Sequence, residues 1–192
     1  MDEKELMQQY GTTYAEEAGF TLRNTPSPLF KLLVLSILLS ARIRAENAVR
    51  AARALFKEGL TTPQKMADAT WRQRVTILNQ NGYARYDEKT SRMLGENARM
   101  LLDRYAGDLR NLRQAAQRIP DKEKELLKEF KGIGDVGADI FFREVQAIWD
   151  ELYPFLGKKA AQQAQKMDID TGRINKDDYP RLAAALVRKS LE

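Results

Sequence analysis

The sequence contains no cysteine and no histidine, and these absences remove several kinds of chemistry before any motif is considered. Without cysteine there are no disulfides, no thiolate nucleophile and no cysteine-bound zinc or iron–sulfur cluster. Without histidine, acid–base chemistry and metal binding depend on carboxylates, lysine, tyrosine or the backbone. We therefore expect no metal site built from side chains. The lack of cysteine is also consistent with a reducing cytosol.

A targeting segment and long apolar runs are missing as well. The N-terminus, MDEKELMQQY, is charged and polar, so we expect no signal peptide. The most apolar run, LFKLLVLSILLSA at 29–41, is too short to cross a bilayer and is interrupted by Lys31 and Ser36. We expect a cytoplasmic protein with no membrane partner, in which this run is a buried helix. The net charge of +5 suits a polyanionic partner, but a solvated basic surface explains it equally well.

Almost every segment has its apolar residues at helical period, and no convincing β-run is present. Thr13 and Glu16 form a capping-box pattern, Pro63 opens a short helix, and Gly82 follows an asparagine in a turn. The longer helices are expected at 29–40, 44–57, 86–105, 109–118, 121–130, 136–152, 158–167 and 178–191. The sequence predicts an all-α single domain, residues 1–192, of about ten helices.

Three of the 11 glycines lie within six residues, in the stretch FKGIGDVGADI at 130–140. We call Lys131 to Gly134 the glycine turn. Gly132 and Gly134 permit unusual backbone angles and close approach, and Ile133 between them is expected to lie beneath the turn. The N–H groups of the turn and of the next helix are suited to holding a phosphate. Gly137 and the alanine after it are expected to let the second helix cross close to the first. An ordinary helix corner remains the alternative.

This stretch has the pattern of a helix-hairpin-helix motif, which grips DNA backbone without reading sequence. With two further stretches it resembles the endonuclease III-like (HhH-GPD) superfamily of DNA glycosylases. SPLFKLLVLSILLSAR at 27–42 is similar to that family's early core helix, and LNQNGYARYDEKTSRMLGENARMLL at 78–102 to its turn and long helix. LLKEFKGIGDVGADI at 126–140 is similar to its hairpin. The resemblance covers about residues 25–190.

The resemblance implies a two-lobed helical fold with no iron–sulfur cluster. The central lobe would comprise about 25–135, and the second lobe 1–24 plus about 136–192. Double-stranded DNA would bind in the cleft between the lobes, mainly through its backbone, with a damaged base flipped into the cleft. The residues implied as DNA contacts are Lys131, Gly132, Ile133, Gly134, Val136, Gly137, Arg42 and Tyr83.

Two of these contacts have particular roles in the family. Arg42 falls where members carry a polar residue that fills the gap left in the duplex, and Tyr83 or its neighbours fall on the wedge turn. From the residues alone, Arg42 could equally be a solvated cation at a helix end, and Tyr83 a core tyrosine. The backbone carbonyls of the hairpin could hold a monovalent cation, and no other cofactor is expected.

Both catalytic positions of the family hold the wrong side chain here. Bifunctional members carry a lysine two residues after the second hairpin glycine, where it forms a Schiff base with the sugar, and this chain has Val136. A carboxylate that stabilises the positive sugar follows roughly twenty residues later, at the start of a helix, and the best register puts Gly157 there. Asp170, in IDTGR, has a similar local context but lies too far on, and Asp150 comes too early.

Three hypotheses follow from the sequence. The first is a DNA-binding protein on the glycosylase scaffold whose catalytic centre is degenerate. The second is a monofunctional DNA glycosylase, without lyase activity, that uses Asp170 or Asp150. The third is a helical protein-interaction domain that keeps the scaffold and does not bind DNA.

Overall fold

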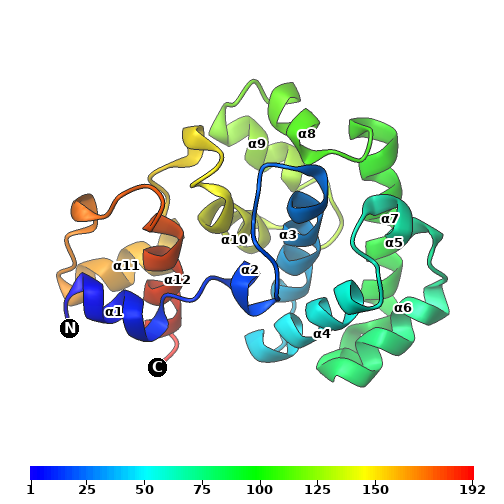
Figure 1. Cartoon of the computed structure of the whole chain (residues 1–192), viewed down its shortest axis with the longest axis horizontal. Coiled ribbons are helices and arrows are strands. Elements are labelled where there is room, and N and C mark those ends of the chain that lie inside the picture. Colours follow the sequence, from blue (N-terminus) through cyan, green and yellow to red (C-terminus); the bar gives the residue numbers. More distant parts are fainter.

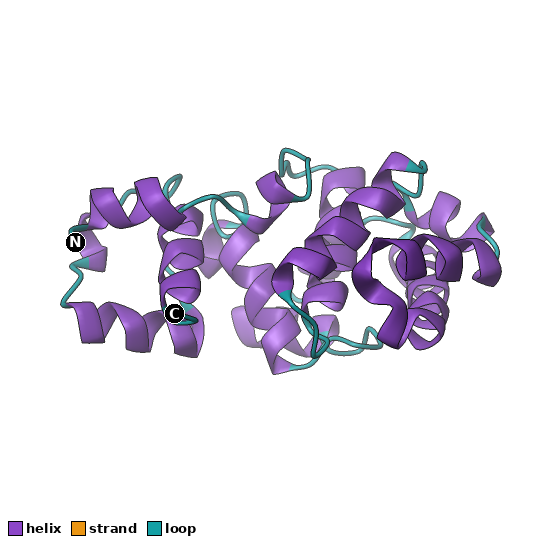
Figure 2. Cartoon of the chain, turned by 90° about the horizontal axis from the view of Figure 1, so that it is seen from below, coloured by secondary structure: helices purple, strands orange, loops and turns teal.

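The computed structural model describes all residues, 1–192, and its regular elements are all helical (Figure 2), which confirms the all-α prediction. The α-helices are α1 (Glu3–Tyr10), α2 (Tyr14–Glu17), α3 (Pro26–Leu39), α4 (Ala45–Lys57), α5 (Pro63–Asp68), α6 (Trp71–Leu78), α7 (Asp87–Tyr105), α8 (Leu109–Ala115), α9 (Pro120–Leu127), α10 (Asp135–Val145), α11 (Gly157–Met167) and α12 (Tyr179–Lys189). Short 3-10 or π segments lie at Asn79–Tyr83, Ala84–Tyr86, Asp150–Leu152 and Thr171–Arg173. None of the helices has both the length and the apolar character needed to span a membrane.

The helices form two groups, each with its own hydrophobic cluster. In Figure 1, α1, α11 and α12 gather at one end of the molecule with both termini, α3, α4 and α10 lie in the middle, and α5 to α7 lie at the other end. The larger cluster has 37 buried residues and the smaller has 8. Two separate clusters joined along α10 and α12 give the two-lobed shape that the resemblance implied.

Helix α3 is the axis of the larger cluster, as expected of the most apolar run. It is buried on all sides, with Leu29, Leu32, Leu35 and Leu38 fully enclosed, and a helix that is apolar all round belongs in the interior. Its one buried hydroxyl, on Ser36, donates a hydrogen bond of 2.8 Å to a carbonyl one turn back, so the polar group carries little cost. α4, α8 and α10 pack around this axis.

The hydrophobic clusters do not divide the chain at the predicted lobe boundary near 136. α10 carries Phe141, Phe142 and Val145 into the larger cluster because it packs directly on α3. Tyr14 and Phe20, near the N-terminus, belong to the larger cluster as well. The chain therefore passes between the two clusters at about 11–13 and again at about 153–156.

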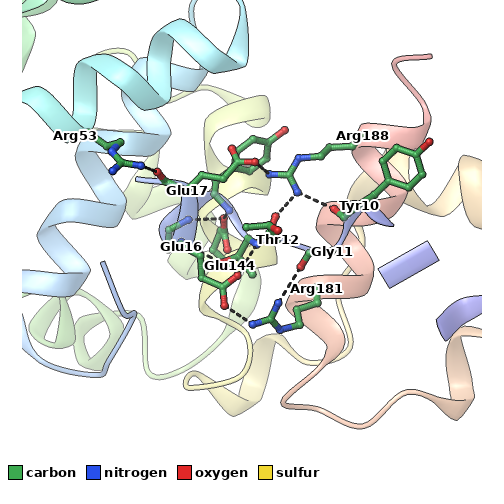
Figure 3. A network of polar contacts seen from close by, with 12 residues as sticks. Tyr10, Gly11, Thr12, Glu16, Glu17, Arg53, Glu144, Arg181 and Arg188 are labelled. Atoms are coloured by element: carbon green, nitrogen blue, oxygen red, sulfur yellow. Dashed lines mark hydrogen bonds and ion pairs between the residues drawn. The ribbon is translucent and has the colours of Figure 1, made fainter. Parts of the chain in front are cut away.

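A polar network joins the segment between α1 and α2 to α12 (Figure 3). Arg188 donates to the backbone carbonyls of Tyr10, at 2.8 Å, and Thr12, and forms an ion pair of 2.8 Å with Glu17. Its guanidinium lies over the Tyr14 ring, 4.6 Å from the centroid. One arginine of the smaller cluster thus holds the segment that leads into the larger one.

A buried carboxylate from α10 completes this connection (Figure 3). Glu144 accepts hydrogen bonds from the backbone N–H groups of Tyr14, at 2.5 Å, and Ala15, at 3.2 Å. It therefore caps the N-terminus of α2 from a distant part of the chain. Burial raises the pKa of Glu144 to about 7, opposed by the two N–H groups and by the positive charges of Arg143 and Arg188.

A second buried carboxyl lies at the start of α9. Glu123 is completely buried, and neither of its oxygens has a hydrogen-bond donor from another group. Glu151 lies within hydrogen-bonding reach of it, and Arg113 binds Glu151 through two bonds of 2.7 Å. Two carboxyl groups can share a hydrogen bond only when one is protonated. Burial and the Glu151 charge raise the pKa of Glu123 to about 8, so Glu123 is the protonated partner.

Candidate nucleic-acid interface

The glycine turn joins α9 to α10 and needs its first glycine. Gly132 has φ of +86°, and a Cβ there would lie 3.2 Å from the Met93 side chain and 3.3 Å from that of Ile37. A side chain would thus meet both left-handed backbone strain and crowding. Ile133 is 5% exposed and packs beneath the turn, as the sequence predicted.

Asn97 of α7 fixes the turn from below. Its Oδ1 accepts the N–H of Lys131 at 2.9 Å, and its Nδ2 donates to the carbonyl of Lys131 at 2.8 Å. Asn97 was not predicted from the sequence. The signal that could have identified it is an asparagine on the apolar face of a long helix, where a polar side chain needs a partner. The carbonyls of Phe130 and Lys131 each accept a hydrogen bond already, from Ile133 and Asn97 respectively. A monovalent cation held there, which stays a prediction, would share these oxygens.

Several backbone donors of the turn face solvent without a partner. The N–H groups of Gly132, Gly134, Asp135 and Val136 donate no hydrogen bond within the protein, and all four residues are exposed. Gly134 provides no side-chain cap for α10, and a Cβ built on it would meet nothing within 4 Å. Unpaired N–H groups at the positive end of a helix dipole form an anion-binding surface.

Gly137 has a packing role that differs from the predicted one. A Cβ at this position would lie 2.6 Å from Oγ of Ser40, at the end of α3, and 3.0 Å from the Ile133 side chain. The missing side chain therefore lets α10 approach α3, whereas the sequence analysis expected close approach to the preceding helix. Because Gly137 is buried, it is not a direct DNA contact.

A pocket of about 660 Å³ lies beside the glycine turn, and we call it the turn pocket. Four cations and one acid line it: Arg42, Lys89, Arg92, Lys131 and Glu96. Arg42 is exposed and makes no ion pair or hydrogen bond, so its charge is available to a ligand. The Lys131 ammonium binds Glu96 at 2.6 Å, which lowers the pKa of that carboxyl and offsets the lysine charge.

Tyr83 cannot serve as the wedge that the resemblance implied. Its side chain is fully buried, and its hydroxyl donates a hydrogen bond of 2.8 Å to the carbonyl of Leu38. Burial raises the pKa of Tyr83 to about 12. The reachable side chains of this turn are its neighbours: Arg85 is exposed and lies over the half-buried Tyr86 ring, 5.2 Å from the centroid.

A second pocket, of about 440 Å³, lies between the two hydrophobic clusters, and we call it the cleft pocket. Its lining comes from α10, from the first turn of α11, from the segment between α3 and α4, and from α12. Val136, at the predicted lysine position, is 63% exposed at its edge. Lys158 and Lys159, at the start of α11, line it too, and neither forms an ion pair.

Gly157, the first residue of α11, lies against α10 beside the cleft pocket, and the space for its side chain is already taken. A Cβ at Gly157 would lie 3.0 Å from Nη1 of Arg143 and 3.3 Å from Oδ2 of Asp139. With φ of +74°, the backbone there also favours glycine. The structure thus brings together Val136 and the start of α11, as the predicted register requires. It also places there a carboxylate, Asp139, that the sequence analysis did not consider.

The two other candidate carboxylates lie outside both pockets. Asp150 forms an ion pair with Lys176, which lowers its pKa. Asp170 accepts the N–H of Gly172 at 3.1 Å and pairs with Arg173 at 2.9 Å. Both are surface groups occupied by local partners, so the geometry does not assign catalysis to either. Nowhere do three or more possible metal-ligand side chains converge.

Comparisons with known proteins support the fold. No protein-family model matches the chain, and no curated protein gives a significant match. Among solved structures, the chain is similar to that of a trapped endonuclease III–DNA covalent intermediate in an estranged-adenine complex. The TM-score is 0.52 at 15% sequence identity, over 97% of this chain and 85% of that one. The chain therefore has an all-helical fold of the endonuclease III kind.

Proposed function

We propose that this protein binds double-stranded DNA through the sugar–phosphate backbone, using the glycine turn and the start of α10 as a helix-hairpin-helix. The observation that carries the proposal is the row of unpaired, exposed N–H groups at Gly132, Gly134, Asp135 and Val136. Phosphate oxygens satisfy such donors, and backbone N–H groups do not distinguish one base from another. We therefore expect little sequence preference.

The charges around the glycine turn support the same proposal. Arg42, Lys89 and Arg92 line the turn pocket without forming ion pairs, so up to three phosphates can be neutralised beside the turn. Each neutralised phosphate contributes about −0.9 to the slope of log affinity against log salt. A slope of about −1 to −3 is therefore expected for a duplex of random sequence. The fold that the chain shares with endonuclease III in a DNA complex supports the same proposal.

The side chain at position 136 limits the chemistry. Valine has no amine, so a Schiff base with a sugar aldehyde cannot form there. We propose that the protein has no lyase activity of the lysine-dependent kind. A reducing agent that traps imines should leave the protein uncrosslinked to DNA that carries an abasic site.

The proposal is tested by fluorescence anisotropy with a labelled duplex at several salt concentrations. Gly134→Glu places a negative side chain where the phosphate would lie, without strain, because the backbone is ordinary (φ −100°) and a Cβ there meets nothing. We expect at least about a tenfold loss of affinity. The matched control is Gln9→Glu on α1, which makes the same charge change at another exposed site.

The outcomes distinguish a DNA-binding protein from a protein-interaction domain. Salt-dependent binding that is lost in Gly134→Glu and kept in Gln9→Glu supports the DNA-binding proposal. No binding by the wild type leaves the protein-interaction domain as the better account of the scaffold. Equal binding by both variants would show that the glycine turn does not hold the DNA.

A further inference from the structure

The exposed face of α4 carries a concentration of positive charge that the glycine turn does not use. A pocket of about 530 Å³ lies there, between α4, the N-terminal half of α3 and the segment after α6, and we call it the α4 pocket. Four cations line it and no acidic residue does: Lys31, Arg50, Arg53 and Lys57. The turn pocket and the cleft pocket, by contrast, each contain a carboxylate. Positive charge without compensation in the protein predicts an anionic partner.

Three of these cations form a stripe along α4. Arg50, Arg53 and Lys57 are three and four residues apart, so they lie on the same side of the helix and span about 10 Å of its axis. All three are exposed, and Arg53 alone makes a hydrogen bond within the protein, of 2.9 Å to the carbonyl of Glu17. The Glu17 carboxylate is paired with Arg188, which offsets its charge (Figure 3). The charge of the stripe is therefore available to a ligand.

Lys31, which interrupts the apolar run of α3, adds to this surface. Its ammonium lies over the rings of Phe20 and Phe56, 5.6 and 5.7 Å from their centroids. Aromatic rings attract a cation without neutralising it, so Lys31 is held beside the pocket with its charge intact. Phe56 is the aromatic residue of the lining, and it already packs against Phe20 and Lys31. The surface thus has no free aromatic anchor of the kind that protein interfaces use, and its charge suits a nucleic-acid backbone.

The α4 pocket and the turn pocket lie toward opposite ends of α3 and share no residue. Lys31 is in the second turn of α3, whereas Ser40 and Arg42 of the turn pocket follow its last residue. The rise of an α-helix puts about 15 Å of axis between the two positions. A phosphate at the glycine turn therefore leaves the stripe on α4 unoccupied.

We propose that the α4 pocket is a second phosphate-binding surface, which holds the backbone of another segment of duplex DNA while the glycine turn holds the first. This inference rests on the proposed DNA binding and extends it from one duplex segment to two. One molecule of the protein then bridges two duplexes. Because lysine and arginine contact phosphate mainly through charge, the second site should show no sequence preference and should weaken as salt is raised.

A bridging assay with the whole chain tests the proposal. One short duplex is fixed to beads, another carries a fluorophore, and the fluorescence retained on the beads is measured as protein is added. The wild type should retain the labelled duplex, whereas Arg50→Glu/Lys57→Glu should retain at least about fivefold less. In solution this variant should bind a single duplex within about threefold of the wild type, because its glycine turn is intact. Both side chains are exposed, so the variant should fold.

The matched control is Lys65→Glu/Lys166→Glu, which reverses the same amount of charge at exposed positions outside both pockets and should bridge as the wild type does. Single-duplex binding by the wild type without bridging would overturn the inference and leave the DNA-binding proposal standing. Bridging that persists in Arg50→Glu/Lys57→Glu would overturn it too, because the second duplex would then be held elsewhere.

An acidic protein segment is the competing occupant of this surface. A labelled oligoglutamate peptide that binds the wild type and not Arg50→Glu/Lys57→Glu, in the absence of bridging, would assign the α4 pocket to such a partner and overturn the inference. Absence of any DNA binding by the wild type would instead sink the proposed function itself, and this inference with it.

Discussion

Replacing Glu123 by glutamine should stabilise the protein, by an amount that depends on pH. In the folded chain Glu123 is buried beside Glu151 with its pKa raised, so it is protonated at neutral pH, whereas in the unfolded chain it ionises freely. Folding at neutral pH must therefore take up a proton. Glutamine has a similar shape, donates to Glu151 through its amide and takes up no proton, so this cost disappears in Glu123→Gln.

The size of the effect follows from the two pKa values. The pKa of Glu123 is about 8 in the folded chain against an ordinary 4.5. Between these values each pH unit lowers the wild-type free energy of unfolding by about 1.4 kcal/mol, because only the folded state binds the proton. The stabilisation in Glu123→Gln should be close to zero below pH 4.5, should reach at most about 3–4 kcal/mol at pH 7, and should level off above pH 8.

Urea denaturation at a series of pH values measures this difference directly. Glu125→Gln on the exposed face of the same helix is the matched control, and its stability should follow the wild type at every pH. A Glu123→Gln variant whose advantage is the same at pH 5 and pH 8 would refute the protonated carboxyl pair. So would a variant that is less stable than the wild type at pH 8.

Three further changes test other parts of the structure. Glu144→Ala leaves two buried N–H groups of α2 without an acceptor and should cost about 2 kcal/mol or more, with faster hydrogen exchange at those amides, whereas Glu144→Gln should cost less. Glu96→Gln frees the Lys131 ammonium and should steepen the salt dependence of DNA binding by up to about 0.9; an unchanged slope would show that Lys131 does not reach phosphate. Gly137→Val forces α10 away from α3 and should lower stability by about 1–3 kcal/mol in a thermal melt, while Gly134→Ala should not.

Capping residues and prolines predicted the starts of helices well, because each acts on residues within one helical turn of it in the sequence. The capping box of Thr13 and Glu16 is present, and Thr62 caps the helix that Pro63 begins. The helix predicted at 136–152 ends instead at Val145, and the side chain of the next residue, Gln146, binds both the N–H and the carbonyl of Phe155. Such a contact across nine residues leaves no periodic trace in a sequence.

Those features of the candidate site that depend on residues close together in the sequence could be predicted, and those that depend on distant residues could not. The turn around Ile133 and its free N–H groups follow from the spacing of the glycines. The buried position of Tyr83 involves a hydrogen bond from its hydroxyl to a carbonyl of α3, which lies 45 residues away in the sequence. The nearness of Asp139 to Gly157 arises only when α10 and α11 are brought together. A register argument can say which position lacks a carboxylate, but it cannot say which distant residue fills the space.

The two places where the chain crosses between its hydrophobic clusters are braced by side chains of α12. Arg188 holds the first crossing through Tyr10, Thr12 and Glu17, and Arg181 binds Glu16 and the carbonyl of Gly11 beside it. α10 also packs on α12 directly. Any turn of one cluster against the other would have to break these contacts together, so the waist of the molecule is a stiff joint, and the width of the cleft pocket is fixed by two arginines of one helix.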